Sequence, residues 1–220
     1  MKPYKFIISG GGTGGHLYPA LAIAEELRSR HKTADILFVG ALGRIEMNKV
    51  PEAGYRIIGL WIDGIQRSYS FRNLIFPAKL IFSLLKSIAI LLKFRPDVVV
   101  GTGGFASGPL LFMAGLFKIP TLIQEQNSYP GITNKLLSKI VKTIAVAHLG
   151  LDRFFPKDKL NLTGNPIRKS IAEGKLNSNK AKLLFEQLPG KTTLVILGGS
   201  LGARRINQLV ASHLDAFEKM

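Results

Sequence analysis

Seven consecutive residues near the start of the chain, Gly10-Gly11-Gly12-Thr13-Gly14-Gly15-His16, limit what it can fold into more than any other stretch. A run of β-forming residues, 4–9, leads into them, and a run with helical character, 17–29, follows. A strand, a glycine loop and a helix in this order bring backbone N–H groups and the positive end of the helix against an anion. Glycines allow the backbone to approach a ligand that a Cβ would keep away. The stretch therefore predicts a phosphate-type binding loop in an α/β fold.

His16 stands directly after the glycines. A dinucleotide-binding loop has no need for an imidazole there, whereas a site that moves a proton beside a phosphate does. The next predicted strand, 36–39, is followed by no acid before Glu46, which argues against NAD. Two alternatives stay open: Arg44 is compatible with NADP, and His16 could simply cap the helix.

Two more loops follow predicted strands. The strand 97–100 ends in a second glycine loop, 101–109, and the strand 120–123 ends in Gln124-Glu125-Gln126-Asn127. Because the carboxyl ends of parallel strands meet at one edge of a sheet, we expect all three loops to lie together and to form a site. Each glycine loop alone could also be a tight turn. His16 and Glu125 are the titratable residues expected at this edge.

The composition limits the chemistry. The chain has no cysteine and only four histidines, so neither a thiolate metal site nor another structural metal is expected, and no cofactor is predicted. No signal peptide is recognised, which favours the cytoplasm. The net charge of +16 favours an anionic partner, namely nucleic acid, an anionic membrane or a phosphorylated substrate. The alternative is a solvated basic surface, and no nucleic-acid-binding motif is present.

The segment 74–94 is the most apolar stretch and predicts a helix. Lys79, Lys86 and Lys93 fall seven residues apart and share, with two serines, an arc of roughly 120° on that helix. One interpretation is a buried crossover helix. The other is that part of the apolar surface is exposed in a lipid interface, with the lysines at the headgroups.

The opening pattern recurs near the end of the chain. A strand over 192–197, a glycine loop containing Ser200 and a helix over 204–219 predict the first βα unit of a second Rossmann-like domain. We therefore expect a first domain over 1–163, a linker over 164–191 and a second domain beginning within 192–220. The other predicted elements are helices over 45–53, 110–117 and 132–141, strands over 55–60, 143–147 and 160–163, and a loop over 62–73.

Several stretches together resemble the MurG family of peptidoglycan N-acetylglucosaminyltransferases. They are GGTGGHLYPALAIAEEL, GTGGFASGP, EQN with GITNK, GNPIR and GGSLGA, and they span residues 10 to 207 in the family's order. The resemblance implies a GT-B fold, in which two Rossmann-like domains face each other across a cleft. It also implies inverting transfer of GlcNAc from UDP-GlcNAc to lipid I (undecaprenyl-diphospho-MurNAc-pentapeptide), giving lipid II, by a peripheral protein on the cytoplasmic face of the bacterial inner membrane.

The resemblance also implies roles for individual residues. From their place at the glycine edge, His16 and Glu125 are expected to be catalytic, with His16 as the base or a donor to the diphosphate, and Glu125 as its orienter or as the base itself. The spacing in the segment 74–94, and not the resemblance, is what predicts membrane contact by Lys79, Lys86 and Lys93. The UDP-GlcNAc site would contain Thr13, Gly14, Gly15, Asn127, Arg168 and Ser200. The acceptor diphosphate would lie against Gly12, Gly103, Gly104 and Phe105.

Two departures from the family bear on these expectations. Many members have His where this chain has Gln124, and members continue for well over a hundred residues beyond the stretches matched here. Two other interpretations are a related glycosyltransferase with another lipid acceptor, such as diacylglycerol, and a non-catalytic basic module that binds membranes.

Overall fold

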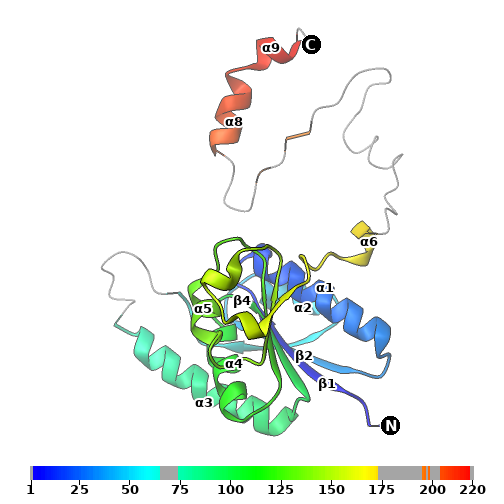
Figure 1. The fold of residues 1–220 in the computed structure, drawn as a ribbon, viewed down its shortest axis with the longest axis vertical. Helices are drawn as coiled ribbons and strands as arrows, with labels where there is room; N and C mark the ends of the chain where they lie inside the picture. The colour runs from blue at the N-terminus through cyan, green and yellow to red at the C-terminus, as the bar shows by residue number, and fades with distance from the viewer. Residues whose placement is uncertain (1, 65–73, 173–194, 197, 199–203, 219–220) are drawn as a thin grey trace. The chain divides into compact units, whose positions relative to one another are not determined.

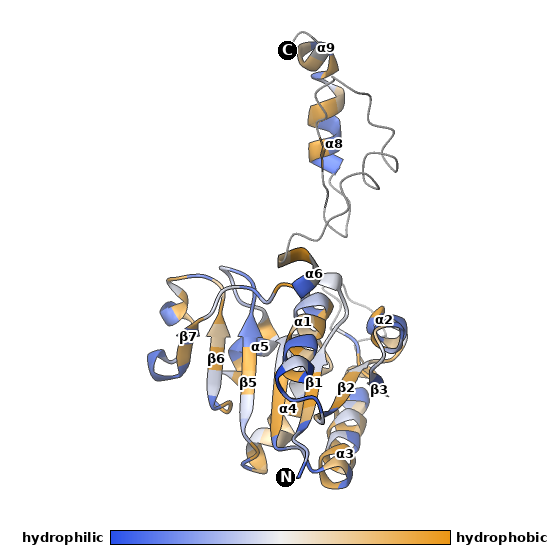
Figure 2. Cartoon of the chain, turned by 90° about the vertical axis from the view of Figure 1, so that its right-hand side faces the viewer, coloured by the Kyte–Doolittle hydropathy of each residue, from blue (hydrophilic) through white to orange (hydrophobic). Residues whose placement is uncertain are grey.

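The computed structural model describes residues 2–64, 74–172, 195–196, 198 and 204–218. A seven-stranded parallel sheet forms the first compact unit, Met1–Glu173. Its strands follow the order β3-β2-β1-β4-β5-β6-β7 (Figure 2). The strands are β1 (Lys5–Gly10), β2 (Asp35–Ala41), β3 (Arg56–Leu60), β4 (Val98–Gly103), β5 (Thr121–Glu125), β6 (Thr143–Val146) and β7 (Leu160–Leu162).

Helices cover both faces of this sheet (Figure 1). Helix α1 (Gly14–Arg30) packs on one face against β1 and β4. Helices α3 (Phe76–Phe94), α4 (Ser107–Leu116) and α5 (Ile132–Leu137) lie next to one another on the other face. The shorter helices are α2 (Glu46–Glu52), α6 (Lys169–Ala172) and the 3-10 turns Leu151–Arg153 and Lys157–Lys159.

Two hydrophobic cores result, because alternate residues of a strand point to opposite faces. Ile7, Val99 and Ile123 belong to the core under α3, α4 and α5. Phe6, Ile8 and Val100 belong to the core under α1. Both faces of the central strands are therefore packed with apolar residues, which explains why their sequences read as continuous apolar runs.

The chain reverses its direction of travel across the sheet between β1 and β4. Strand β1 pairs with β2 on one side and with β4 on the other, and the register against β4 shifts between Ser9 and Gly10. This is the topological switch point, where the loops that follow neighbouring strands diverge and leave room for a ligand. The two glycine loops follow these two strands, so the predicted α/β Rossmann-like sheet and the shared edge are confirmed.

Two predicted helices differ from the structure. The helix expected over 132–141 ends at Leu137, where Ser138 Oγ donates to the Lys135 carbonyl. The helix expected over 204–219 is divided into α8 (Arg204–Ala211) and α9 (Leu214–Glu218), and Ser212 Oγ donates to the Leu209 carbonyl at the break. In both places a serine hydroxyl competes for a helical carbonyl, which weakens the helix locally.

Helix α3 turns the serines of its polar arc inward, while Lys86 and Lys93 stay exposed. Ser83 and Ser87 are fully buried, and Ser83 Oγ donates to the Trp61 carbonyl at 3.1 Å. Lys86 Nζ donates to the Gly59 carbonyl at 2.7 Å, and Lys79 Nζ forms an ion pair with Asp63 at 2.7 Å. The exposed surface of the helix is therefore mostly apolar. In the part of the chain that the structure describes, no helix is both long enough and apolar enough to cross a bilayer.

The second compact unit, Gly174–Met220, contains α8 and α9. Within the strand predicted over 192–197, Val195 and Ile196 are described and are not in a strand, and the other four residues lie outside the described part. Ser200 and most of its predicted loop also lie outside it. The domain boundaries proposed from the sequence therefore stay predictions.

Candidate active site at the glycine edge

The first glycine loop ends at the start of α1. Gly12 has φ +84°, a left-handed conformation that favours glycine, and Thr13 precedes the helix in an extended conformation. The Thr13 side chain makes no capping bond, and the first turn of α1 has no acidic residue. The first amides of a helix have no acceptor within it. The amides at Thr13, Gly14 and Gly15 are therefore suited to a bound anion.

The second glycine loop packs against the first through the backbone. Gly103 and Gly104 have φ +101° and +90°. A Cβ on Gly104 would lie 2.3 Å from the carbonyl oxygen of Gly11, and the Gly11 amide donates to the Gly103 carbonyl at 3.3 Å. Any side chain at Gly104 would force the loops apart, so the glycines here serve loop contact as well as ligand approach.

His16 bridges the two loops. Its Nδ1 lies 2.9 Å from the Thr102 carbonyl oxygen, and Thr102 Oγ1 donates to the His16 carbonyl at 2.7 Å. Because a carbonyl only accepts, Nδ1 is the nitrogen that carries the proton, and Nε2 of the neutral ring is left as the acceptor. A Cβ on Gly103 would lie 2.6 Å from Nδ1, so glycine there makes room for the ring.

Glu125 is surrounded by donors. Its side chain is 1% exposed, and Oε1 accepts from the Asn127 amide at 3.0 Å and from Asn127 Nδ2 at 3.1 Å. Oε2 accepts from the Gly131 amide at 3.1 Å and from Asn134 Nδ2 at 2.9 Å. Four N–H donors thus hold this carboxylate to its own loop and to the start of α5. The geometry makes Glu125 the organiser of the 126–131 turn.

A chain of amides joins this loop to His16. Gln126 Nε2 donates to Thr102 O at 2.8 Å, on the carbonyl that also binds His16. It also donates to Gln124 Oε1, and Gln124 Nε2 donates to Asn165 Oδ1 at 3.2 Å. Sequence reasoning placed Gln124 and Gln126 in a loop of the site and noted Gln124 as a departure from the family, but it missed the hydrogen bonds that both residues make.

The other predicted site residues lie around this centre. The Phe105 ring is half-exposed and lies against Gly12 and Gly64, and Asn127 is exposed beside Glu125. The Arg168 guanidinium lies 5.2 Å from the ring centre of Tyr18, at the start of α1. Lys79, Lys86 and Lys93 lie on α3, on the other face of the sheet from α1, and none of them belongs to this edge.

Glu46 was missed as a site residue. It is fully buried at the start of α2, and Oε2 accepts from the Gly12 amide at 2.8 Å. Its Oε1 accepts from the Ala41 amide at 3.0 Å. The sequence showed only that this acid comes too late after β2 for a dinucleotide ribose, and no local pattern indicated that it folds back under the glycine loop.

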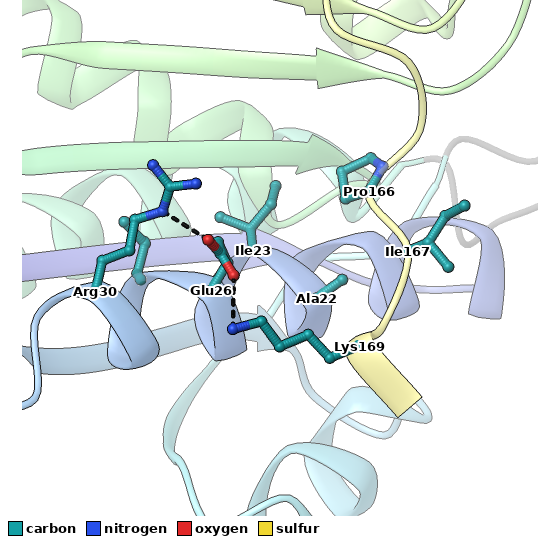
Figure 3. A pocket seen from close by; sticks show the side chains of 8 residues that line it. Ala22, Ile23, Glu26, Arg30, Pro166, Ile167 and Lys169 are labelled. Carbon is teal, nitrogen blue, oxygen red and sulfur yellow. Dashed lines mark hydrogen bonds and ion pairs between the residues drawn. The ribbon is translucent and has the colours of Figure 1, made fainter. Parts of the chain in front are cut away.

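A shallow pocket lies away from the glycine edge, between the side of α1 and the segment that carries Arg168 (Figure 3). Glu26 lies in it between Arg30 and Lys169, at 2.6 and 3.3 Å. The hydrogen bond to Arg30, and then the one to Lys169, lowers the pKa of the Glu26 carboxyl. These contacts hold the segment against α1 within the first unit. The described residues include no group of three or more His, Asp or Glu side chains able to hold a metal ion.

Comparison with known sequences gives one consistent result. Residues 6–146 match the glycosyltransferase family 28 N-terminal domain. The chain is 58% identical over 98% of its length to the UDP-N-acetylglucosamine–N-acetylmuramyl-(pentapeptide) pyrophosphoryl-undecaprenol N-acetylglucosamine transferase of Flavobacterium psychrophilum. It is 55% identical over 97% of its length to the transferase of the same name from Cytophaga hutchinsonii. The chain spans 59% and 58% of the length of these relatives.

Solved structures share the fold. The MurG of Acinetobacter baumannii matches with a TM-score of 0.65 and 26% identity, over 95% of this chain and 65% of that one. The UDP-GlcNAc 2-epimerase of Neisseria meningitidis matches with a TM-score of 0.64 and 16% identity, over 94% of this chain and 62% of that one, which shows a common fold alone. The predicted α/β fold of GT-B type is therefore confirmed.

Proposed function

Because the chain belongs to the glycosyltransferase family 28 N-terminal domain family, we propose that it is the acceptor-binding part of an enzyme that makes lipid II. The enzyme would transfer GlcNAc from UDP-GlcNAc to lipid I with inversion. The names of the relatives support both substrates. The observation that carries the proposal is the His16 ring, held by Thr102 O between two glycine loops that suit a diphosphate.

His16 is the proposed base. The acceptor's 4-hydroxyl would give its proton to Nε2 while its oxygen forms a bond to the anomeric carbon of GlcNAc. The bond from that carbon to the UDP oxygen would break, and UDP would leave with the bonding electrons. General-base help of this kind contributes about 10²–10⁴ in rate. The Thr102 carbonyl fixes the tautomer that leaves Nε2 unprotonated.

Glu125 is proposed as a positioning residue. Its four hydrogen bonds are all to its own turn and to Asn134, so both carboxylate oxygens are already occupied. In this role it orders the turn that carries Asn127. The alternative in which Glu125 itself takes the proton would require these bonds to break first.

Each substrate is assigned its own set of binding residues. Thr13, Gly14 and Gly15 are proposed to bind the donor's phosphates, with Asn127, Arg168 and Ser200. Gly12, Gly103, Gly104 and Phe105 are proposed to line the acceptor diphosphate. The Gly12 N–H donates to Glu46, so Gly12 would contact the acceptor through its Cα and not through its amide.

The outer face of α3 is proposed to lie on the cytoplasmic surface of the inner membrane. Ile81, Phe82, Leu85 and Leu92 are more than half exposed there. Lys79 and Lys86 bind Asp63 and the Gly59 carbonyl, so Lys93 is the lysine of the three best placed to meet an anionic headgroup. A near-surface lysine contributes about 1 kcal/mol to such binding.

A transfer assay with the full-length protein tests the function. We expect GlcNAc transfer to a soluble lipid I analogue and none to diacylglycerol, and transfer to diacylglycerol alone would overturn the acceptor. His16→Ala is expected to reduce turnover at least about tenfold with little change in melting temperature. His31→Ala, at the opposite end of α1, is the control. A lower melting temperature with unchanged turnover would make His16 a structural residue.

A further inference from the structure

Glu46 is a buried carboxylate to which the reaction described above assigns no step. It is 0% exposed, although glutamate is rarely buried without a partner. The salt bridges of the described residues do not include it. Its partners are two backbone amides, Gly12 at 2.8 Å and Ala41 at 3.0 Å. It therefore connects the end of β2 to the loop after β1, across 34 residues of sequence.

The backbone makes room for this side chain. A Cβ on Gly11 would lie 2.2 Å from Cδ and Oε1 of Glu46, and a Cβ on Gly40 would lie 2.5 Å from its Cγ. Both glycines therefore leave space for the carboxylate. Glycine is needed at position 11 because the Glu46 side chain fills the space of a Cβ, and it is favoured at position 12 because the φ there is positive.

The hydrogen bond from the Gly12 amide to Glu46 fixes the loop directly before the amides that are suited to an anion. Gly12 is the residue with φ +84°, two positions before α1 begins. The Thr13 side chain makes no capping bond at this end of the helix. The Glu46 carboxylate, which accepts from the Gly12 amide, instead fixes the loop just before α1. Occupying the Gly12 amide leaves those of Thr13, Gly14 and Gly15 for a ligand.

We propose that Glu46 is a positioning residue that presets the first glycine loop for a diphosphate group. The proposal rests on the proposed function, because that function supplies the diphosphate. Preorganised donors cost no rearrangement when charge reaches them, and small displacements of such donors are expensive in rate. Loss of the Glu46 carboxylate would therefore weaken substrate use in a protein that is still folded.

The test uses Glu46→Gln, which places an NH₂ group where one of the two amides needs an acceptor. In the full-length protein we expect KM for UDP-GlcNAc to rise, or kcat to fall, by about tenfold or more, because the Thr13, Gly14 and Gly15 amides are the ones proposed to bind the donor's phosphates. Glu46→Asp keeps both oxygens but is one methylene shorter. Its KM and kcat should lie between those of the parent and those of Glu46→Gln. Glu52→Gln, on the exposed side of α2, is the matched control.

A second measurement separates this inference from the function itself. The Gly12 amide proton of this chain should resonate far downfield and move upfield in Glu46→Gln, and titration with inorganic pyrophosphate should shift the Thr13–Gly15 amides less in the variant than in the parent. If the parent shows no transfer, the proposed function fails while the amide data still judge Glu46. Unchanged KM and kcat with only a lower melting temperature would overturn the inference. Failure of both variants to fold would also count against it, since Glu46 would then serve the fold alone.

Discussion

Position 124 has to donate and accept at the same time. Gln124 Oε1 accepts from Gln126, and its Nε2 donates to Asn165 at 3.2 Å. A neutral imidazole also offers one donor and one acceptor, whereas a protonated one offers two donors. The glutamine of this chain and the histidine of many family members can therefore fill the same place, and only the histidine depends on pH.

Gln124→His is expected to make the stability of the first unit depend on pH. The folded state needs the neutral imidazole, so its pKa would be lower in the folded chain than in the unfolded one. Stability would be kept above roughly pH 6.5, the ordinary histidine pKa, and lost as the pH falls below it. Thermal unfolding at about pH 8 and about pH 5.5 measures this. Asn48→His on exposed α2 is the control, and identical pH profiles for the two variants would contradict the argument.

Glu125→Gln is expected to lower the free energy of unfolding by about 1–3 kcal/mol, because each carboxylate oxygen accepts two hydrogen bonds and two of the four donors then face an NH₂ group. Urea unfolding of this chain measures the loss. Glu52→Gln, which removes an exposed pair with Lys49, should change stability by less than about 0.5 kcal/mol. If Glu125→Gln left stability unchanged but abolished transfer, the carboxylate would be the base after all.

At the scale of residues, sequence could indicate His16 and Glu125 because His16 directly follows the first glycine loop and Glu125 stands at the end of a strand. It could not separate their roles, which depend on hydrogen-bond partners 86 residues away for His16 and 2 to 9 residues away for Glu125. Glu46 was beyond reach for the same reason, since only the folded chain brings it under Gly12.

Among the elements, α3 directs most of its polar side chains toward the neighbouring edge of the sheet. Ser83, Lys86 and Lys79 bind two backbone carbonyls and Asp63 in the segment from β3 to residue 63. Strand β3 is an edge strand, and edge strands are usually protected from further pairing. The polar arc thus satisfies groups at this edge, and the apolar remainder is left on the surface.

Substituting Phe82→Asp together with Leu85→Asp is expected to reduce binding to anionic vesicles by about tenfold or more, because burial of each apolar side chain contributes about 1.5–3 kcal/mol. The two residues are 62% and 61% exposed, so folding should be unaffected. Trp61, the only tryptophan of the chain, lies 6.2 Å from the Phe82 ring and reports the contact by its fluorescence.

Leu42→Asp, at an exposed apolar residue after β2, is the control for that experiment. Equal vesicle binding by the parent and the double variant would show that α3 is not the membrane-binding face. A blue shift of Trp61 emission on vesicle addition is expected in the parent and in Leu42→Asp, and not in the double variant.

Most elements of the first unit were predictable, because strand, loop and helix alternate with clear apolar runs and glycine punctuation. The ends of helices were less so, since Ser138 and Ser212 shorten helices by bonds to carbonyls that periodicity does not reveal. The direction of α3 was also hidden. Its sequence left open a buried crossover helix or a helix in a lipid interface with the lysines at the headgroups, and the Gly59 carbonyl that binds Lys86 comes from the neighbouring strand.

For the whole molecule, the greater length of its relatives sets an expectation about activity. Residues 1–220 taken alone are expected not to transfer GlcNAc, because the relatives whose names describe the activity are about 1.7 times as long, as the 59% coverage implies. They are expected to keep weak affinity for a lipid I analogue through the glycine loops. Calorimetric titration with UDP-GlcNAc and a transfer assay measure both. Micromolar donor binding, or lipid II formed by these residues alone, would contradict it.

The contact between the two glycine loops bears on how an inhibitor bound there could be evaded. Such a compound would touch backbone amides and carbonyls, which substitutions other than proline leave in place. Gly104 cannot gain a side chain without striking the Gly11 carbonyl, and Gly12 and Gly103 adopt a backbone conformation that other residues avoid. Resistance in culture should therefore arise at exposed rim side chains such as Tyr18 and Phe105, and the glycines should survive selection unchanged.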